Sequence, residues 1–158
     1  MRFISQGWKV ITVEDGNNVD AISHSTCSMA IDVKAKSIVV STLSGRTARM
    51  VSRFRCPIDI IGMTTSEKVW RKLNLSWGVT PILTEEVFSM EVMFYNAVKQ
   101  AEKEFKLAKG DNVVLTGGLI NGKTGNTNII LASHQSQLLF FLSLLRLLGL
   151  PGFLLLGL

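Results

Sequence analysis

The side chains best suited to bind a small ligand lie in a short polar segment, TLSGRT, at positions 42–47, here called the first loop. A helix that starts in this loop would offer free backbone N–H groups and the positive end of its dipole, which favour an anion such as phosphate. The same residue types are also typical of a plain helix cap, so both interpretations stay open. The residues that combine hydroxyl groups, backbone freedom and one positive charge are Thr42, Ser44, Gly45, Arg46 and Thr47.

A second loop of small residues contains the sequence GGLINGKT, which satisfies the GxxxxGK[ST] pattern of a nucleotide-binding P-loop. A true P-loop leads into a helix that points at the phosphates, whereas residues 127–131 predict a strand. We therefore favour a loop that closes over a ligand held by the first loop. A free-standing phosphate- or nucleotide-binding enzyme remains the alternative. The second loop, residues 118–125, contributes Gly118, Asn121, Gly122, Lys123, Thr124 and Gly125.

Patterns for catalysis and metal binding are not found elsewhere in the sequence. No nucleophile, base and orienting group occur at a recognisable spacing, and His24 and His134 have no other ligand type at metal-binding spacing. Cys27 and Cys56 are interpreted as buried small hydrophobic residues in a reduced compartment. We expect no catalytic residue and no metal site in this chain.

Three arginines, Arg46, Arg49 and Arg53, share one face of a predicted helix, which raises the question of a nucleic-acid surface. The chain has 17 Lys plus Arg against 12 Asp plus Glu, a net charge of +5 that favours anionic partners in general. No aromatic residues alternate with the arginines, as single-stranded nucleic acid would require for stacking. We expect a solvated helix face and no nucleic-acid partner.

The 21 residues 138–158 differ from the rest of the chain, because they hold twelve Leu, three Phe and a single charge, Arg146. Their length suits a membrane span of about 20 apolar residues. Gly149 and Pro151 interrupt the run, and the restricted alphabet is typical of low-complexity sequence. Three interpretations stay open: a fragmentary or frameshifted end, an anchor that makes the chain a membrane-tethered binding module, and a helix that covers a partner or the core. Membrane contact is expected only through these residues.

The elements that would position the two loops alternate between strands and helices. The predicted connection between the last two strands is too short for a crossover, so this pair is expected to be antiparallel. The alternation predicts an α/β fold: an open, mainly parallel five-stranded sheet with helices on both faces and an antiparallel last strand. Strands are predicted at residues 37–42, 57–63, 79–83, 112–116 and 127–131, and helices at 20–35, 47–53, 67–73 and 89–107.

Single residues suggest where some of these elements begin and end. Asp20 is the expected N-cap of the first helix, Gly110 is the expected stop of the long helix, and Pro81 indicates an edge strand.

The N-terminal residues contain no secretory signal, so we expect a cytoplasmic protein. The chain is divided into a poorly determined lead-in at 1–17, an α/β domain at 18–131 and an atypical Leu-rich tail at 132–158.

Several short segments, taken in order and at their spacing, resemble the C-terminal domain of pyruvate kinase. The resemblance covers residues 18–130. The segments that carry it are DAISHSTC at 20–27, SIVVSTLSGRTARMVSRFR at 37–55, WGVTP at 77–81, KGD at 109–111 and GNTN at 125–128.

This resemblance implies a five-stranded α/β domain that is not catalytic by itself. In the full enzyme, which converts phosphoenolpyruvate and ADP to pyruvate and ATP in glycolysis, the catalytic residues and the Mg²⁺ and K⁺ sites belong to a barrel domain with no counterpart here. No cofactor is therefore expected in this chain. The C-terminal domain helps to join subunits and, in regulated members, binds a phosphorylated effector, which implies a homo-oligomer and places the effector at the first and second loops.

Two departures from the family pattern bear on the effector. Members that bind fructose 1,6-bisphosphate often have a basic residue where Leu43 stands, and the segment 88–96 lacks the Trp and Arg that hold the second phosphate. The resemblance therefore favours a sugar monophosphate or a nucleoside monophosphate at least as much as fructose bisphosphate.

Overall fold

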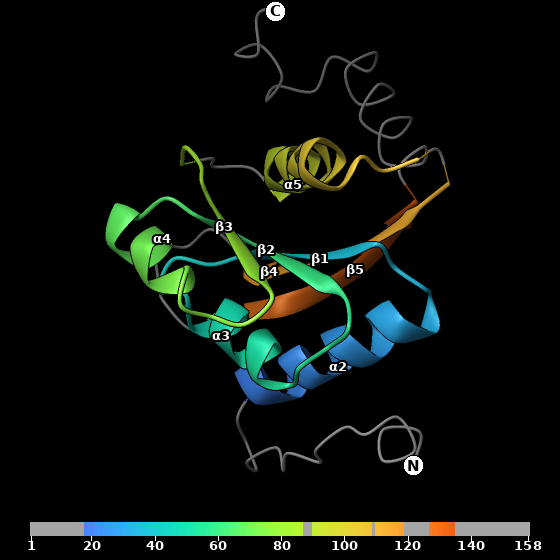
Figure 1. Cartoon of the computed structure of the whole chain (residues 1–158), viewed down its shortest axis with the longest axis horizontal. Helices are drawn as coiled ribbons and strands as arrows, with labels where there is room; N and C mark the ends of the chain where they lie inside the picture. Colours follow the sequence, from blue (N-terminus) through green and yellow to red (C-terminus); the bar gives the residue numbers. More distant parts are fainter. Residues whose placement is uncertain (1–17, 87–89, 109, 119–126, 135–158) are drawn as a thin grey trace, which may run out of the picture.

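The computed structural model describes residues 18–86, 90–108, 110–118 and 127–134. Within these residues four helices and five strands alternate along the chain (Figure 1). The expected lead-in, most of the second loop and the Leu-rich residues 138–158 lie outside the described residues. The elements are α2 (Asn18–Asp32), β1 (Ser37–Ser41), α3 (Arg46–Arg53), β2 (Asp59–Thr64), α4 (Glu67–Leu73), β3 (Val79–Leu83), α5 (Met90–Phe105), β4 (Asn112–Gly118) and β5 (Thr127–His134).

The five strands form one sheet in the order β3-β2-β1-β4-β5. β1 lies between β2 and β4, and its parallel register places Val39 opposite Ile61 on one side and Leu115 on the other. β2 and β3 are also parallel, while β4 and β5 are antiparallel. The predicted fold class is confirmed, and Pro81 lies in the edge strand β3, where its missing N–H leaves no partner strand unsatisfied.

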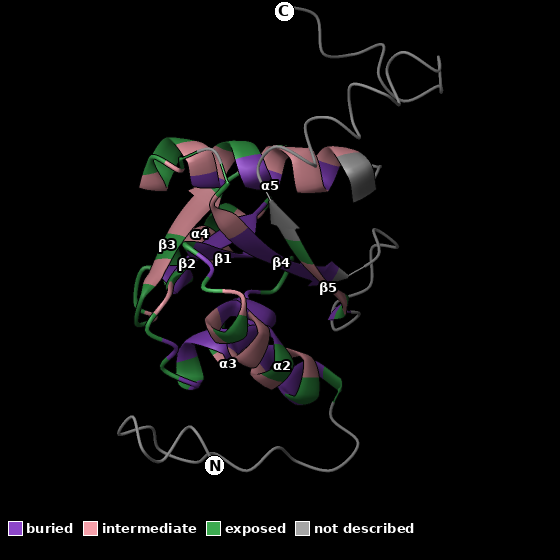
Figure 2. Cartoon of the chain, turned by 90° about the vertical axis from the view of Figure 1, so that its right-hand side faces the viewer, coloured by how far each residue is buried: buried purple, intermediate pink, exposed green. Residues whose placement is uncertain are grey.

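The core forms two layers because successive side chains of a strand point to opposite faces of the sheet. Ile38 and Val40 of β1 belong to the layer covered by α2, α3 and α4, and Val39 belongs to the layer covered by α5. Figure 1 shows α2 and α3 below the sheet and α5 above it, and Figure 2 shows buried positions along the central strands between them. The β-branched run of β1 is therefore explained by burial on both faces.

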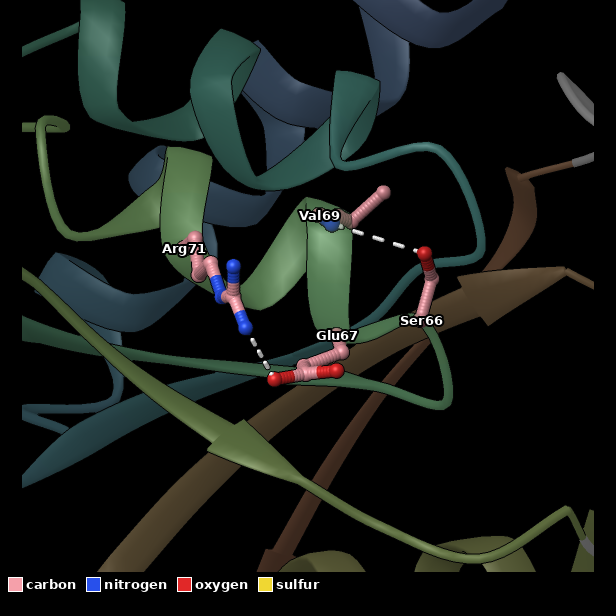
Figure 3. A network of polar contacts seen from close by, with 4 residues as sticks. All are labelled: Ser66, Glu67, Val69 and Arg71. Carbon is pink, nitrogen blue, oxygen red and sulfur yellow. Dashed lines mark hydrogen bonds and ion pairs between the residues drawn. The ribbon is translucent and has the colours of Figure 1, made fainter.

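Helix α4 begins at a serine cap. The Ser66 hydroxyl accepts a hydrogen bond from the backbone N–H of Val69, at 3.4 Å, and the Glu67 carboxylate pairs with Arg71 one turn along the helix (Figure 3). The Trp70 indole Nε1 donates to the Pro81 carbonyl at 3.0 Å. This short helix is thus fixed at its start by a cap and along its side by a bond to the edge strand.

The bounds of α2 and α5 differ from the predicted ranges 20–35 and 89–107. α2 already includes Asn18, so Asp20 is not the N-cap; it lies in the first turn, 2% exposed, with its carboxylate 4.0 Å from the Arg53 guanidinium. α5 ends at Phe105, two residues before the predicted end at 107, because Lys106 and not Gly110 adopts a left-handed backbone conformation, with φ 49°. The helix therefore stops at a lysine and not at the glycine that the sequence pattern favoured.

β5 is longer than the predicted strand 127–131. It continues to His134, where it pairs with Asn112 at the start of β4. The sheet therefore includes three residues that the sequence analysis assigned to the tail.

No helix in the described ranges is both long enough and apolar enough to cross a membrane. The interpretation of residues 138–158 as an anchor concerns a segment outside those ranges.

Candidate phosphate site at the β1–α3 turn

The first loop joins the carboxyl end of β1 to the first turn of α3, as predicted. The Thr42 hydroxyl accepts a hydrogen bond from the Gly45 N–H at 3.0 Å, and the Ser44 hydroxyl accepts a longer one from the Arg46 N–H at 3.4 Å. Thr42 is buried and Ser44 is exposed. The two hydroxyl groups therefore shape the turn, and Ser44 is the one that also faces solvent.

Gly45 is required by both its conformation and its surroundings. Its φ is +75°, in the left-handed region, and a Cβ at this position would lie 2.8 Å from Val69 Cγ1 of α4. The sequence analysis interpreted Gly45 as a residue that lets a ligand approach the backbone. The close neighbour here is α4, so packing of the protein itself already accounts for the glycine.

The N-terminus of α3 has backbone N–H groups that donate no hydrogen bond to any described residue. The first backbone hydrogen bond of the helix runs from the Arg49 N–H to the Gly45 carbonyl, and the N–H groups of Thr47 and Ala48 have no acceptor within the described part of the chain. The Arg46 guanidinium is exposed and makes no ion pair or hydrogen bond there either. Two amides and one cation are thus available at one helix end.

The first loop is tied to the strand that follows the second loop. The hydroxyl oxygens of Thr47 and Thr127 lie 2.6 Å apart, and both side chains are buried. Thr127 is the first residue of β5. The sequence analysis missed Thr127 as a site neighbour, although it belongs to the GNTN segment that carries the resemblance.

The start of the second loop also lies next to the end of β1. A Cβ at Gly117 would approach the Ser41 side chain to 3.4 Å and the Met93 methyl group to 3.3 Å. β4 then ends at Gly118, which is also the first residue of the second loop. The residues that flank the second loop, Gly117 and Thr127, therefore lie beside Ser41 and Thr47, which are at the two ends of the β1–α3 turn.

The remaining predicted residues of the second loop lie outside the described residues. They are Asn121, Gly122, Lys123, Thr124 and Gly125. The described chain resumes with the antiparallel strand β5, which is the element the sequence predicted and is not the helix that a P-loop leads into.

The arginine face of α3 is exposed, as predicted, and its contacts are to the protein itself. Arg49 Nε donates to the Gly45 carbonyl at 3.4 Å, and Arg53 lies near Asp20. Arg55, just beyond the helix, stacks over the Trp77 ring at 4.9 Å. In the ranges that the structure describes, no group of three or more His, Cys, Asp or Glu side chains is arranged to hold a metal ion.

The fold and the turn define a class of protein: an open α/β domain with a donor-rich helix start at the sheet edge where such domains bind ligands. A family model described as "Pyruvate kinase, alpha/beta domain" matches residues 20–131. The chain belongs to this family, which confirms the resemblance recognised from the sequence segments.

Three curated relatives agree with the family match, and each of them is named pyruvate kinase. The chain is 39% identical over 117 residues to the protein of Clostridium acetobutylicum, covering 74% of this chain and 25% of that relative. It is 35% identical over 115 residues to that of Sporosarcina psychrophila, covering 73% and 20%. It is 37% identical over 112 residues to that of Staphylococcus aureus, covering 71% and 19%. The chain thus spans a quarter or less of the length of these relatives.

Proposed function

We propose that this chain acts as the effector-binding and subunit-association domain of a pyruvate kinase and is not catalytic by itself. The relatives extend far beyond the matched region. We propose that those further regions transfer phosphate from phosphoenolpyruvate to ADP. The Mg²⁺ and K⁺ ions that this reaction uses would bind there as well. The effector is a phosphorylated small molecule, and the enzyme is a cytoplasmic homo-oligomer.

The observation that carries the effector proposal is the donor set at the N-terminus of α3. The N–H groups of Thr47 and Ala48 have no acceptor among the described residues, and Arg46 beside them is exposed and unpaired there. A phosphate group would accept from these amides and from the guanidinium, and the helix dipole would favour its charge. The bound anion would thereby supply the acceptors that the helix start lacks.

The other residues of the first loop have supporting roles in this proposal. Ser44 is exposed and its hydroxyl hydrogen can turn toward a phosphate oxygen, while Thr42 holds the turn through Gly45. Thr47 connects the turn to β5 through Thr127. We propose that the second loop closes over the bound phosphate from this side, with Lys123 and Thr124 as further donors.

Titration calorimetry on the intact chain tests the effector site with three probes: glucose 6-phosphate, AMP and fructose 1,6-bisphosphate. We expect at least one to bind and Arg46→Ala to weaken it by roughly ten- to a hundredfold, since a hydrogen bond to a charged group contributes about 1.5–3 kcal/mol. Arg55→Ala is the matched control, because it removes the same charge from an exposed position at the other end of α3.

Two outcomes contradict the effector proposal. One is that none of the three probes binds at millimolar concentration. The other is that Arg46→Ala and Arg55→Ala weaken binding equally, because the effect would then reflect net charge and not a site at the first loop.

Sedimentation velocity tests subunit association separately. We expect the intact chain to sediment as a dimer or larger species over a range of concentrations. A monomer at every concentration would remove the association role and would leave the effector site to be judged by calorimetry alone.

A further inference from the structure

Two cysteines lie together in the core layer between α2 and the segment that joins α3 to β2. Cys27 of α2 is 2% exposed, Cys56 is fully buried, and both are free thiols. They are the only two cysteines of the 158-residue chain. The sequence analysis interpreted them separately as small hydrophobic residues, and nothing in their spacing indicated that they meet.

The contacts place the Cys56 sulfur against the backbone of Cys27 in α2, and the Cys27 sulfur against the backbone of α3. The Cys56 thiol donates to the Cys27 carbonyl at 4.0 Å, and the Cys27 thiol donates to the Val51 carbonyl at 3.8 Å. The two thiols also lie close enough to shift each other's pKa. A disulfide needs the two sulfur atoms about 2.05 Å apart, so the Cys56 side chain would turn from the Cys27 carbonyl toward the Cys27 sulfur.

The two thiols are not equivalent in acidity. The hydrogen bond with Cys56, together with burial, raises the pKa of Cys27. The neighbouring Cys27 thiol lowers the pKa of Cys56, because its S–H can turn from the Val51 carbonyl to stabilise a thiolate at that position. Cys56 is therefore the better nucleophile of the pair, and Cys27 is the proton-bearing partner.

We propose that Cys27 and Cys56 are a redox-active dithiol, which hydrogen peroxide converts to a reversible disulfide that joins α2 to the α3–β2 connection. The Cys56 thiolate attacks one peroxide oxygen, the O–O bond breaks, and a sulfenic acid forms at Cys56 as hydroxide leaves. The Cys27 sulfur then attacks the Cys56 sulfur, the S–O bond breaks, and the leaving oxygen takes the Cys27 proton as water. In sum, two thiols and one peroxide give one disulfide and two waters.

The position of the pair determines what the bond would do. α3 begins at the first loop and ends just before Cys56, so the disulfide would fix the far end of the helix whose start is the candidate phosphate site. Burial also slows access by peroxide, and it protects the disulfide from reductants once formed. The dithiol would therefore respond to sustained oxidation, during which local opening admits the oxidant.

The test is the redox equilibrium of the intact chain with reduced and oxidised glutathione, approached from both the dithiol and the disulfide. The same measurement is made on the folded protein and on the chain unfolded in urea, with free thiols trapped by alkylation before mass spectrometry. We expect the folded pair to form the intramolecular disulfide at least about tenfold more favourably than the unfolded chain, because folding holds the sulfurs together. Hydrogen peroxide should give the same cross-linked peptide.

Two results would overturn the proposal. In the first, the folded chain keeps its dithiol in a buffer that oxidises the unfolded chain, which would make the cysteines inert core residues. In the second, oxidation yields only glutathione mixed disulfides or cross-linked dimers.

Single variants test the order of attack. With peroxide, Cys27→Ala should accumulate a sulfenic acid at Cys56 that a dimedone-type reagent labels, whereas Cys56→Ala should be labelled at least about fivefold less at Cys27. Equal or reversed labelling would contradict Cys56 as the nucleophile. Circular dichroism checks that each variant folds, and if either does not, the glutathione equilibrium of the unmodified chain decides the proposal alone.

Discussion

At the scale of single residues, replacing Gly45 by a residue with a side chain should destabilise the fold in two ways, through the backbone conformation and through packing. Alanine in the left-handed conformation costs about 1–2 kcal/mol, and a Cβ only 2.8 Å from Val69 adds a packing cost of roughly 1–3 kcal/mol. Gly78 has a similar φ of +66°, but a Cβ there would have no neighbour within 4 Å. Urea unfolding should therefore show a larger loss of stability for Gly45→Ala than for Gly78→Ala. Equal losses would mean that α4 shifts at no cost.

The hydroxyl pair of Thr47 and Thr127 makes a second prediction at this scale. Thr47→Val leaves the buried Thr127 hydroxyl without its partner and should cost about 1–3 kcal/mol, as should Thr127→Val. The double variant should lose less than the sum, because no polar group is then left unpaired. A double-mutant cycle from urea unfolding measures this coupling. Strict additivity would show that the contact contributes nothing.

The candidate site was partly predictable because half of it is local in sequence. The first loop follows a β-branched run and starts a helix, so Thr42 and Gly45 were placed correctly at the turn. The Thr47–Thr127 contact was not predictable, since the two residues are 80 positions apart and meet only through the sheet order. Cys27 and Cys56 were hidden for the same reason, with 29 positions between them.

At the scale of elements, α4 depends on its cap more than a longer helix would, because a short helix has few internal bonds. Ser66→Ala removes the acceptor for the Val69 N–H and should lower the free energy of unfolding by about 1 kcal/mol. Thr65→Ala, at the exposed neighbouring position, is the control and should change it by less than about 0.5 kcal/mol. Thermal or urea unfolding compares them. A Ser66→Ala protein as stable as the control would rule out the cap as a stabilising contact.

Element boundaries were predicted where a local signal sets them and missed where tertiary contacts do. α4 and β3 have the predicted bounds, because Ser66 caps the first and Pro81 suits the edge position of the second. The end of α5 was predicted at residue 107 with Gly110 as the stop, yet the helix ends at Phe105 and Lys106 adopts the left-handed conformation, for which lysine has no intrinsic preference. Such a stop at a lysine is not visible in a periodic pattern.

At the scale of the whole molecule, the sheet order predicts a gradient of amide hydrogen exchange. β1 has a partner strand on each side and a helix layer on each face, whereas β3 is an edge strand with partly exposed side chains. We expect the amides of Ile38 and Val40 to exchange only through global unfolding and those of β3 to exchange faster through local opening. NMR exchange on the intact chain measures this order. Equally slow exchange in β3 would indicate that another chain covers this edge.

The central position of β1 also has a consequence for how the chain is made. β1 leaves the ribosome shortly before β2 and can pair with it soon, but its other neighbour, β4, follows only after α5 has been synthesised. Until then the backbone N–H and C=O groups on one edge of the most apolar strand are unpaired, and a strand of another chain can pair with them. A nascent chain stalled before Asn112 would therefore be prone to aggregate, and the arrival of β4, followed at once by its hairpin partner β5, completes the sheet late and nearly in one step.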